Sequence, residues 1–146
     1  MLLALTAGSF VYAEENVLPP ANRSYFINLD QPTIAKGYTV SAFNGAIKFS
    51  LAPGILSQSS GVEAVEINEI IDGPWQLEKI SKVYQFEFKN KAAYDNKKPF
   101  YIQLSYDKPA DYYKQVFYYD KNYNSWRPLP TVDYSDQSFV RSLIHL

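Results

Sequence analysis

Pro99-Phe-Tyr-Ile-Gln-Leu-Ser-Tyr106 is the stretch that decides the fold, and Asp107-Lys-Pro109 ends it. Apolar and polar side chains alternate along it. The same pattern occurs in Ala46-Ile-Lys-Phe-Ser-Leu51 and in Lys114-Gln-Val-Phe-Tyr-Tyr-Asp120. A period of two that is closed by Pro, Gly, Asn or Asp is typical of half-buried antiparallel strands. The sequence therefore predicts an all-β fold, an antiparallel β-sandwich of about 8–10 short strands.

The other strand candidates follow one another at roughly 10-residue spacing. We predict strands over residues 24–29, 38–41, 46–51, 62–71, 83–89, 100–106, 114–120, 125–129 and 138–146. Asn44-Gly45 accepts positive φ and predicts a turn before the third strand. No helical periodicity extends over about 11 residues or more, which favours a sandwich over a fold of alternating strands and helices.

Alternation also predicts which side chains are buried. In residues 62–71 we expect Val65 and Ile67 to face inward, and Glu63, Glu66 and Glu69 to form a solvated face. The predicted core consists of Phe49, Leu51, Ile67, Phe86, Ile102 and Leu104.

Composition limits the classes of function. A chain of 146 residues fits one domain, and a composition that is 47% hydrophobic and 16% aromatic excludes a wholly disordered chain. The net charge of −1, with both signs mixed, gives no electrostatic case for binding nucleic acid. Because there is no cysteine, disulfides, thiolate nucleophiles and thiolate metal sites are excluded.

The N-terminus resembles a secretory signal. Residues 2–11 are mostly apolar, and Val11-Tyr-Ala13 fits the positions before a cleavage site. We therefore expect a signal-like segment at 1–13, a linker at 14–23 and the sandwich at 24–146, in an exported protein that is extracellular or at the cell surface. The alternative is a buried N-terminal strand or short helix. The apolar run is shorter than the roughly 20 residues that a membrane-spanning helix needs, so no integral span is expected.

The order of features resembles a known module. Phe49-Ser-Leu-Ala-Pro53-Gly54-Ile-Leu56 is similar to a corner in the β-sandwich shared by zonula occludens proteins, netrin receptors, ankyrins and many bacterial surface proteins. Ser81-Lys-Val-Tyr-Gln-Phe86, Lys98-Pro-Phe-Tyr-Ile-Gln-Leu104 and the Trp hairpin from Asp120 to Leu129 follow in the order seen in that family. The resemblance covers about residues 38–146 and implies a bacterial surface-protein module with this sandwich fold.

Self-cleaving members of that family carry His-Phe-Ser, and here Leu146 follows His145. The sequence ends where the serine of that triplet would stand, so no nucleophile is in evidence and we assign no catalytic residue. We expect the domain to continue past Leu146. A His in this position otherwise indicates an exposed or half-buried strand residue.

Exposed aromatic residues are the candidate contact surface. The chain has 13 Tyr, 9 Phe and 2 Trp, more than one core accommodates. Tyr119, Tyr123 and Trp126 lie around one predicted hairpin, with Asn and Asp nearby, as in carbohydrate-binding and protein-binding surfaces. We predict these three residues as ligand-binding. The alternative is that tyrosine serves only as a good strand former.

Asp120, Asn122 and Asn124 place oxygen atoms at positions 1, 3 and 5 of a calcium-binding pattern. Ser125 stands where the pattern needs Gly, and Thr131 stands where it needs Glu. Asn and Asp also favour hairpin turns, so we predict a turn here, with no metal and no cofactor.

These observations together predict a non-enzymatic, exported structural or interaction module of a larger protein. Its partners would be other domains of that protein, an extracellular protein or a glycan, and not nucleic acid. The alternative is a carbohydrate-binding module that uses exposed Tyr and Trp side chains, and a more remote alternative is an autoproteolytic β-sandwich.

Overall fold

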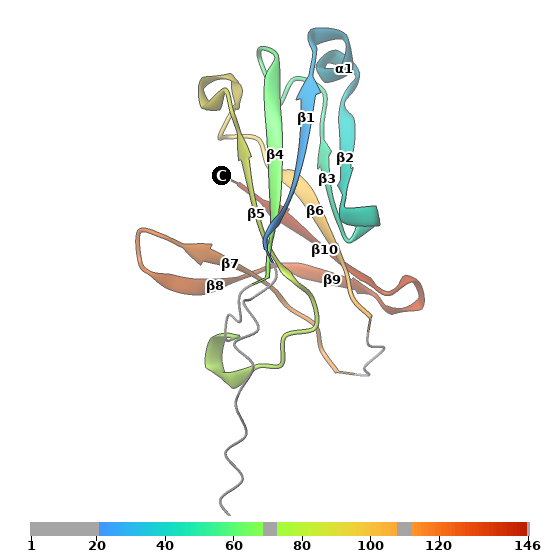
Figure 1. Ribbon diagram of the computed structural model, residues 1–146, viewed down its shortest axis with the longest axis vertical. Helices are drawn as coiled ribbons and strands as arrows, with labels where there is room; N and C mark the ends of the chain where they lie inside the picture. Colours follow the sequence, from blue (N-terminus) through green and yellow to red (C-terminus); the bar gives the residue numbers. More distant parts are fainter. Residues whose placement is uncertain (1–20, 69–72, 108–111, 146) are drawn as a thin grey trace, which may run out of the picture.

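The computed structural model describes residues 21–68, 73–107 and 112–145, and their strands form antiparallel sheets (Figure 1). A three-stranded sheet has the order β1-β4-β5, a five-stranded sheet has the order β2-β3-β6-β10-β9, and β7 and β8 form a separate hairpin. The strands are β1 (Arg23–Leu29), β2 (Tyr38–Ala42), β3 (Ile47–Leu51), β4 (Ser60–Ile67), β5 (Val83–Phe88), β6 (Phe100–Ser105), β7 (Val116–Asp120), β8 (Ser125–Leu129), β9 (Thr131–Tyr134) and β10 (Phe139–Ile144). The predicted all-β sandwich is confirmed.

The core lies between the two larger sheets, and β7–β8 packs beside it (Figure 1). β3 and β6 alternate as predicted, with Phe49, Leu51 and Ile102 buried. Phe86 stacks on Phe49 at a ring-centroid distance of 5.2 Å, and the half-buried Leu104 packs against the same cluster. Five of the six predicted core residues therefore contribute to the core.

The sixth, Ile67, was assigned to the wrong face of its strand. In β4 the buried side chains are those of Ser60, Val62, Ala64 and Glu66, and Val65 and Ile67 are half-buried on the opposite face. The prediction was wrong because both faces of β4 carry apolar residues, so alternation alone does not select one. Glu66, predicted to be solvated, is only 4% exposed.

The other two glutamates predicted to be solvated are Glu63 and Glu69. Glu63 lies on the outer face of β4, as predicted, and pairs with Lys89. Glu69 lies outside the described residues.

A short helix, α1 (Gln31–Lys36), follows β1 and was not predicted. The Asp30 side chain accepts a hydrogen bond from the Thr33 backbone N–H at 3.0 Å, which caps the helix, and Pro32 lies in its first turn. Gly37 ends it with φ 77°. A Cβ at Gly37 would lie 2.9 Å from the carbonyl oxygen of Leu51, so glycine is required where the chain passes from one sheet to the other.

The turn predicted at Asn44-Gly45 is confirmed. The segment Phe43–Gly45 forms a single 3₁₀ turn between β2 and β3, and all three residues have positive φ. Further 3₁₀ turns are Pro74–Gln76, Lys91–Ala93 and Ser135–Gln137. Strand β9 was missed because it is only four residues long and directly follows Pro130.

The predicted signal-like segment 1–13 and linker residues 14–20 lie outside the described residues. Arg23, predicted as the last linker residue, is the first residue of β1. Among the residues described, no helix is long and apolar enough to cross a membrane.

Candidate functional site

The β7–β8 hairpin has one face toward the core and one toward solvent (Figure 1). Val116, Tyr118 and Leu129 belong to the core cluster or pack against it. Because side chains alternate along a strand, the residues between them point outward. Tyr119 pairs with Trp126 in register, and Phe117 pairs with Pro128. Four large side chains therefore lie together on the outward face of the hairpin.

Contacts between rings hold this surface together. The rings of Tyr119 and Trp126 meet edge to face at 5.4 Å. Trp75, from the 3₁₀ turn Pro74–Gln76, meets Phe117 edge to face at 5.6 Å and is still 70% exposed. Edge-to-face pairs at these distances stabilise a fixed arrangement of rings. We call Trp75, Phe117, Tyr119, Trp126 and Pro128 the aromatic face.

A shallow groove of about 450 Å³ adjoins the aromatic face. Its lining consists of Pro74, Trp75, Ser125, Trp126, Arg127 and Pro128. Arg127, the one charged residue among these, has its Nε 3.1 Å from Asp120 Oδ2 and its guanidinium 4.2 Å from the centre of the Tyr123 ring. Its charge is therefore already engaged, and the groove offers a ligand mainly indole and proline surfaces.

The structure brings two of the three predicted site residues together. Tyr119 and Trp126 are in contact, whereas Tyr123 lies in the turn, 69% exposed, with its ring against Arg127. Phe117 and Pro128 were missed, although alternation from Tyr119 and Trp126 would have found them. Trp75 had no such signal, because its contact with Phe117 joins segments far apart in the sequence.

The predicted hairpin turn at 120–125 is confirmed, because the side chain of Asp120 accepts a hydrogen bond from the Asn122 backbone N–H at 3.0 Å. Among the described residues no group of three or more His, Asp or Glu side chains could hold a metal ion. His145 Nδ1 is 3.4 Å from the carbonyl oxygen of Asn96, and the buried Ser142 donates to the carbonyl oxygen of Pro130 at 2.6 Å. Neither of these hydrogen bonds joins Ser142 to His145.

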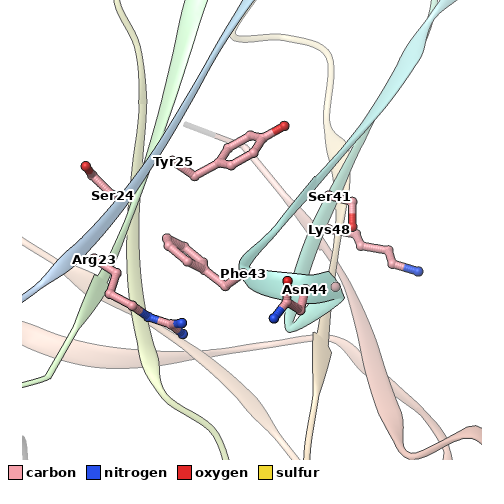
Figure 2. Close-up of a pocket in the computed structure, with 8 residues that line it drawn as sticks. Arg23, Ser24, Tyr25, Ser41, Phe43, Asn44 and Lys48 are labelled. Carbon is pink, nitrogen blue, oxygen red and sulfur yellow. The ribbon is translucent and has the colours of Figure 1, made fainter.

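A second cleft, of about 640 Å³, lies at the turn between β2 and β3 (Figure 2). Arg23 forms two hydrogen bonds with the buried Glu66, Nε to Oε1 at 3.1 Å and Nη2 to Oε2 at 2.7 Å. The same guanidinium lies 5.3 Å from the Phe43 ring, which stacks on Tyr84 at 5.8 Å. Burial, and then the negative charge of Glu66, raises the pKa of Tyr84 to about 12. This cluster joins the two sheets. Within it, Arg23 neutralises the buried Glu66 carboxylate and is not available to a ligand in the cleft.

A third cluster anchors the segment before β7. Lys114 Nζ donates to Asp133 Oδ2 at 2.8 Å, and Tyr106 Oη donates to Asp133 Oδ1 at 2.8 Å. Partial burial alone would raise the pKa of Asp133, but the two hydrogen bonds outweigh it and hold that pKa below its ordinary value. The carboxylate has both oxygens occupied, which indicates a structural role.

Comparisons with known proteins do not add to this picture. Neither a scan against protein-family models nor searches of curated proteins and of solved structures found a match to this chain. The aromatic face is therefore the candidate site on its geometry alone.

Proposed function

We propose that this chain is a non-enzymatic interaction module of an exported protein, and that it binds a partner protein domain through the aromatic face. One observation carries the proposal: Trp75 with Phe117, and Tyr119 with Trp126, form two edge-to-face ring pairs on the outward side of the β7–β8 hairpin. Trp and Tyr dominate the residues that contribute most to protein–protein binding, and charged residues are depleted at the centre of interfaces. The resemblance to surface-protein sandwiches supports the same function.

Photocrosslinking in the source organism tests the proposal. A photoreactive phenylalanine analogue at Phe117 or Tyr119 should give one discrete crosslinked product, and Trp126→Ala should abolish it. The control places the analogue at Phe26, which is 53% exposed on β1 of the three-stranded sheet. Equal crosslinking from both surfaces, or none from the aromatic face, would refute the proposed contact surface.

Export is a separate part of the proposal. Residues 1–23 fused to an alkaline phosphatase without its own signal should give phosphatase activity in a bacterial periplasm. A deletion of residues 2–11 is the control, because it removes the apolar run. Activity that does not depend on that run would contradict export by this segment.

The groove between Trp75 and Trp126 favours a second candidate function, sugar binding. Indole surfaces flanked by a hydroxyl group, here Ser125, suit the apolar face of a neutral pyranose. Affinity electrophoresis on neutral polysaccharides tests it. Retardation that Trp126→Ala removes and Phe26→Ala keeps would replace the protein partner by a glycan.

A further inference from the structure

The outer face of the five-stranded sheet is a second, chemically different surface. Its strands bury one set of alternating side chains, including Val40, Phe49 and Ile102, and direct the other set to solvent. The outward set is rich in hydroxyl and amide groups: Thr39, Ser41, Ser50 and Gln103. Tyr101 lies among them and is 52% exposed. The face is therefore mostly polar on β2, β3 and β6, whereas β9 and β10 add the exposed apolar residues Val132 and Leu143.

Its charges have one sign. Across the strands, Lys48 pairs in register with Gln103, and Gln103 pairs with Arg141, so the two cations lie in one row on β3 and β10 with β6 between them. Two strand spacings separate their backbones by about 10 Å. The five strands contain a single acidic residue, Asp133, and Lys114 and Tyr106 occupy its carboxylate. No carboxylate of these strands neutralises Lys48 or Arg141.

Figure 2 shows Lys48 extending from the β2–β3 hairpin away from Arg23 and Phe43, as the alternation requires. Arg141 is held in place by its neighbours. Its guanidinium lies 5.2 Å from the Tyr134 ring and 5.7 Å from the Phe139 ring, and its Nη2 donates to Gln103 Oε1 at 3.4 Å. A guanidinium fixed on aromatic rings keeps its fork of N–H donors, which matches a carboxylate.

Among the basic residues of the described strands, these two stand out. The other two, Arg23 and Arg127, pair with the carboxylates of Glu66 and Asp120. Within the part of the chain that the structure describes, neither Lys48 nor Arg141 takes part in an ion pair. Both are half-buried in strands, so they hold their charge at fixed positions on the sheet.

We propose that this face binds an acidic polysaccharide, with Lys48 and Arg141 contacting uronate carboxylates along the row. The hydroxyl groups of Thr39, Ser41 and Ser50 and the amide of Gln103 suit the sugar hydroxyls, and the Tyr101 ring offers a platform for a pyranose. A duplex nucleic acid would need many more cations than two. Lysine, present on this face as Lys48, is depleted at the centre of protein interfaces. The inference does not depend on the aromatic face, which lies on the β7–β8 hairpin.

Affinity electrophoresis of the full chain in gels that contain polygalacturonate tests the proposal. The matched polymer is the methyl-esterified form, which has the same sugars without the charges. We expect retardation by the acid and not by the ester. Lys48→Gln/Arg141→Gln should weaken binding by about tenfold or more, because each lost contact is a charge-assisted hydrogen bond. The control Lys97→Gln/Lys121→Gln makes the same change in net charge at exposed residues off this sheet and should leave binding unchanged.

If Lys48→Gln/Arg141→Gln unfolds, the single variant Lys48→Gln replaces it in the binding test. This substitution should not unfold the chain, because Lys48 makes no ion pair among the described residues. Trp126→Ala should retain polygalacturonate binding, which separates this face from the aromatic face. The proposal is overturned if the acid does not retard the protein, or if the control variant loses as much affinity as Lys48→Gln/Arg141→Gln. Poly-glutamate that binds as tightly as polygalacturonate would also overturn it, since the face would then recognise charge and not sugar.

Discussion

The three-stranded sheet carries three glutamates and one arginine in its strands, whereas the five-stranded sheet carries one aspartate, one lysine and one arginine. In the smaller sheet one glutamate, Glu66, points into the protein and is neutralised by Arg23. On its outer face Lys89 bridges Glu63 and Glu87. In the larger sheet the inner faces of β3 and β6 are apolar, and the cations on the outer face lack carboxylates within the strands.

This difference shows that different interactions stabilise the two sheets of the sandwich. The larger sheet is held mainly by apolar burial, and its two cations, Lys48 and Arg141, are left available at the surface. Its one carboxylate, Asp133 at the β9 edge, is bound by Lys114 and Tyr106. The smaller sheet depends partly on an ion pair that must stay intact because one member is buried. Substitutions and pH should therefore affect the two sheets differently.

The largest expected effect is in the core of the five-stranded sheet. Ile102→Ala should lower the free energy of unfolding by about 2–5 kcal/mol, because it leaves a cavity in a packed interior. Ile67→Ala, on the outer face of β4, should cost about 1 kcal/mol or less. Urea denaturation followed by circular dichroism measures both. Equal losses would mean that the two faces of β4 are assigned wrongly.

The ion pair of the smaller sheet should show the next effect. Arg23→Gln should lower the urea midpoint, because the Glu66 carboxylate stays buried without its partner. Adding Glu66→Gln should recover part of the loss, since an amide is less costly to bury than an unpaired carboxylate. Lys89→Gln is the control on the outer face of the same sheet and should change little. If the double variant is less stable than Arg23→Gln, the loss of stability in Arg23→Gln does not come from an unpaired, buried Glu66 carboxylate.

At alkaline pH the smaller sheet should weaken. The pKa of Tyr84 is raised from 10.0 to about 12, first by burial and then by Glu66, so the folded state favours the protonated phenol. This contribution to stability is present below pH 10 and is lost as the pH rises from 10 to about 12. Urea midpoints between pH 8 and 12 should fall less steeply for Tyr84→Phe than for the unaltered chain. Tyr101→Phe is the exposed control, and an unchanged slope in Tyr84→Phe would contradict the assignment.

At acidic pH the edge of the larger sheet should weaken. The pKa of Asp133 lies below its ordinary value because the hydrogen bonds from Lys114 and Tyr106 outweigh partial burial. Its contribution to stability is therefore present above its ordinary pKa and is lost as the pH falls through the lower folded value. Asp133→Asn should remove that part of the acid-induced loss, measured as midpoints between pH 5 and 2. Tyr84→Phe should leave it unchanged.

The same contrast explains what could be predicted from the sequence. In β3 and β6 every inward position is apolar and most outward positions are polar, so alternation identified Phe49 and Ile102 correctly. In β4 apolar residues occupy both faces, and the face is decided by a partner, Arg23, that lies far away in the chain. A local pattern contains no information about such a partner.

The candidate sites, too, could be predicted only in part from the sequence. Tyr119 and Trp126 were found because both lie in one hairpin, and their pairing follows from the turn. Trp75 reaches the aromatic face from a separate turn with φ 51°, which no periodicity indicates. The row formed by Lys48 and Arg141 depends on the strand order β3-β6-β10, which becomes visible only when the sheet is assembled.

The smallest expected effect tests the face assignment of β4 directly. Val65→Thr replaces one β-branched residue by another of similar shape and good strand propensity, at a half-buried position on the outer face. The new hydroxyl can reach water there, so the free energy of unfolding should change by about 0.5 kcal/mol or less. Val62→Thr makes the same chemical change three residues earlier in β4, where the side chain is 1% exposed. There the hydroxyl is buried among apolar groups and should cost about 1–3 kcal/mol. Because the two variants differ only in the face they alter, equal values in urea denaturation would show that β4 does not present Val62 to the core.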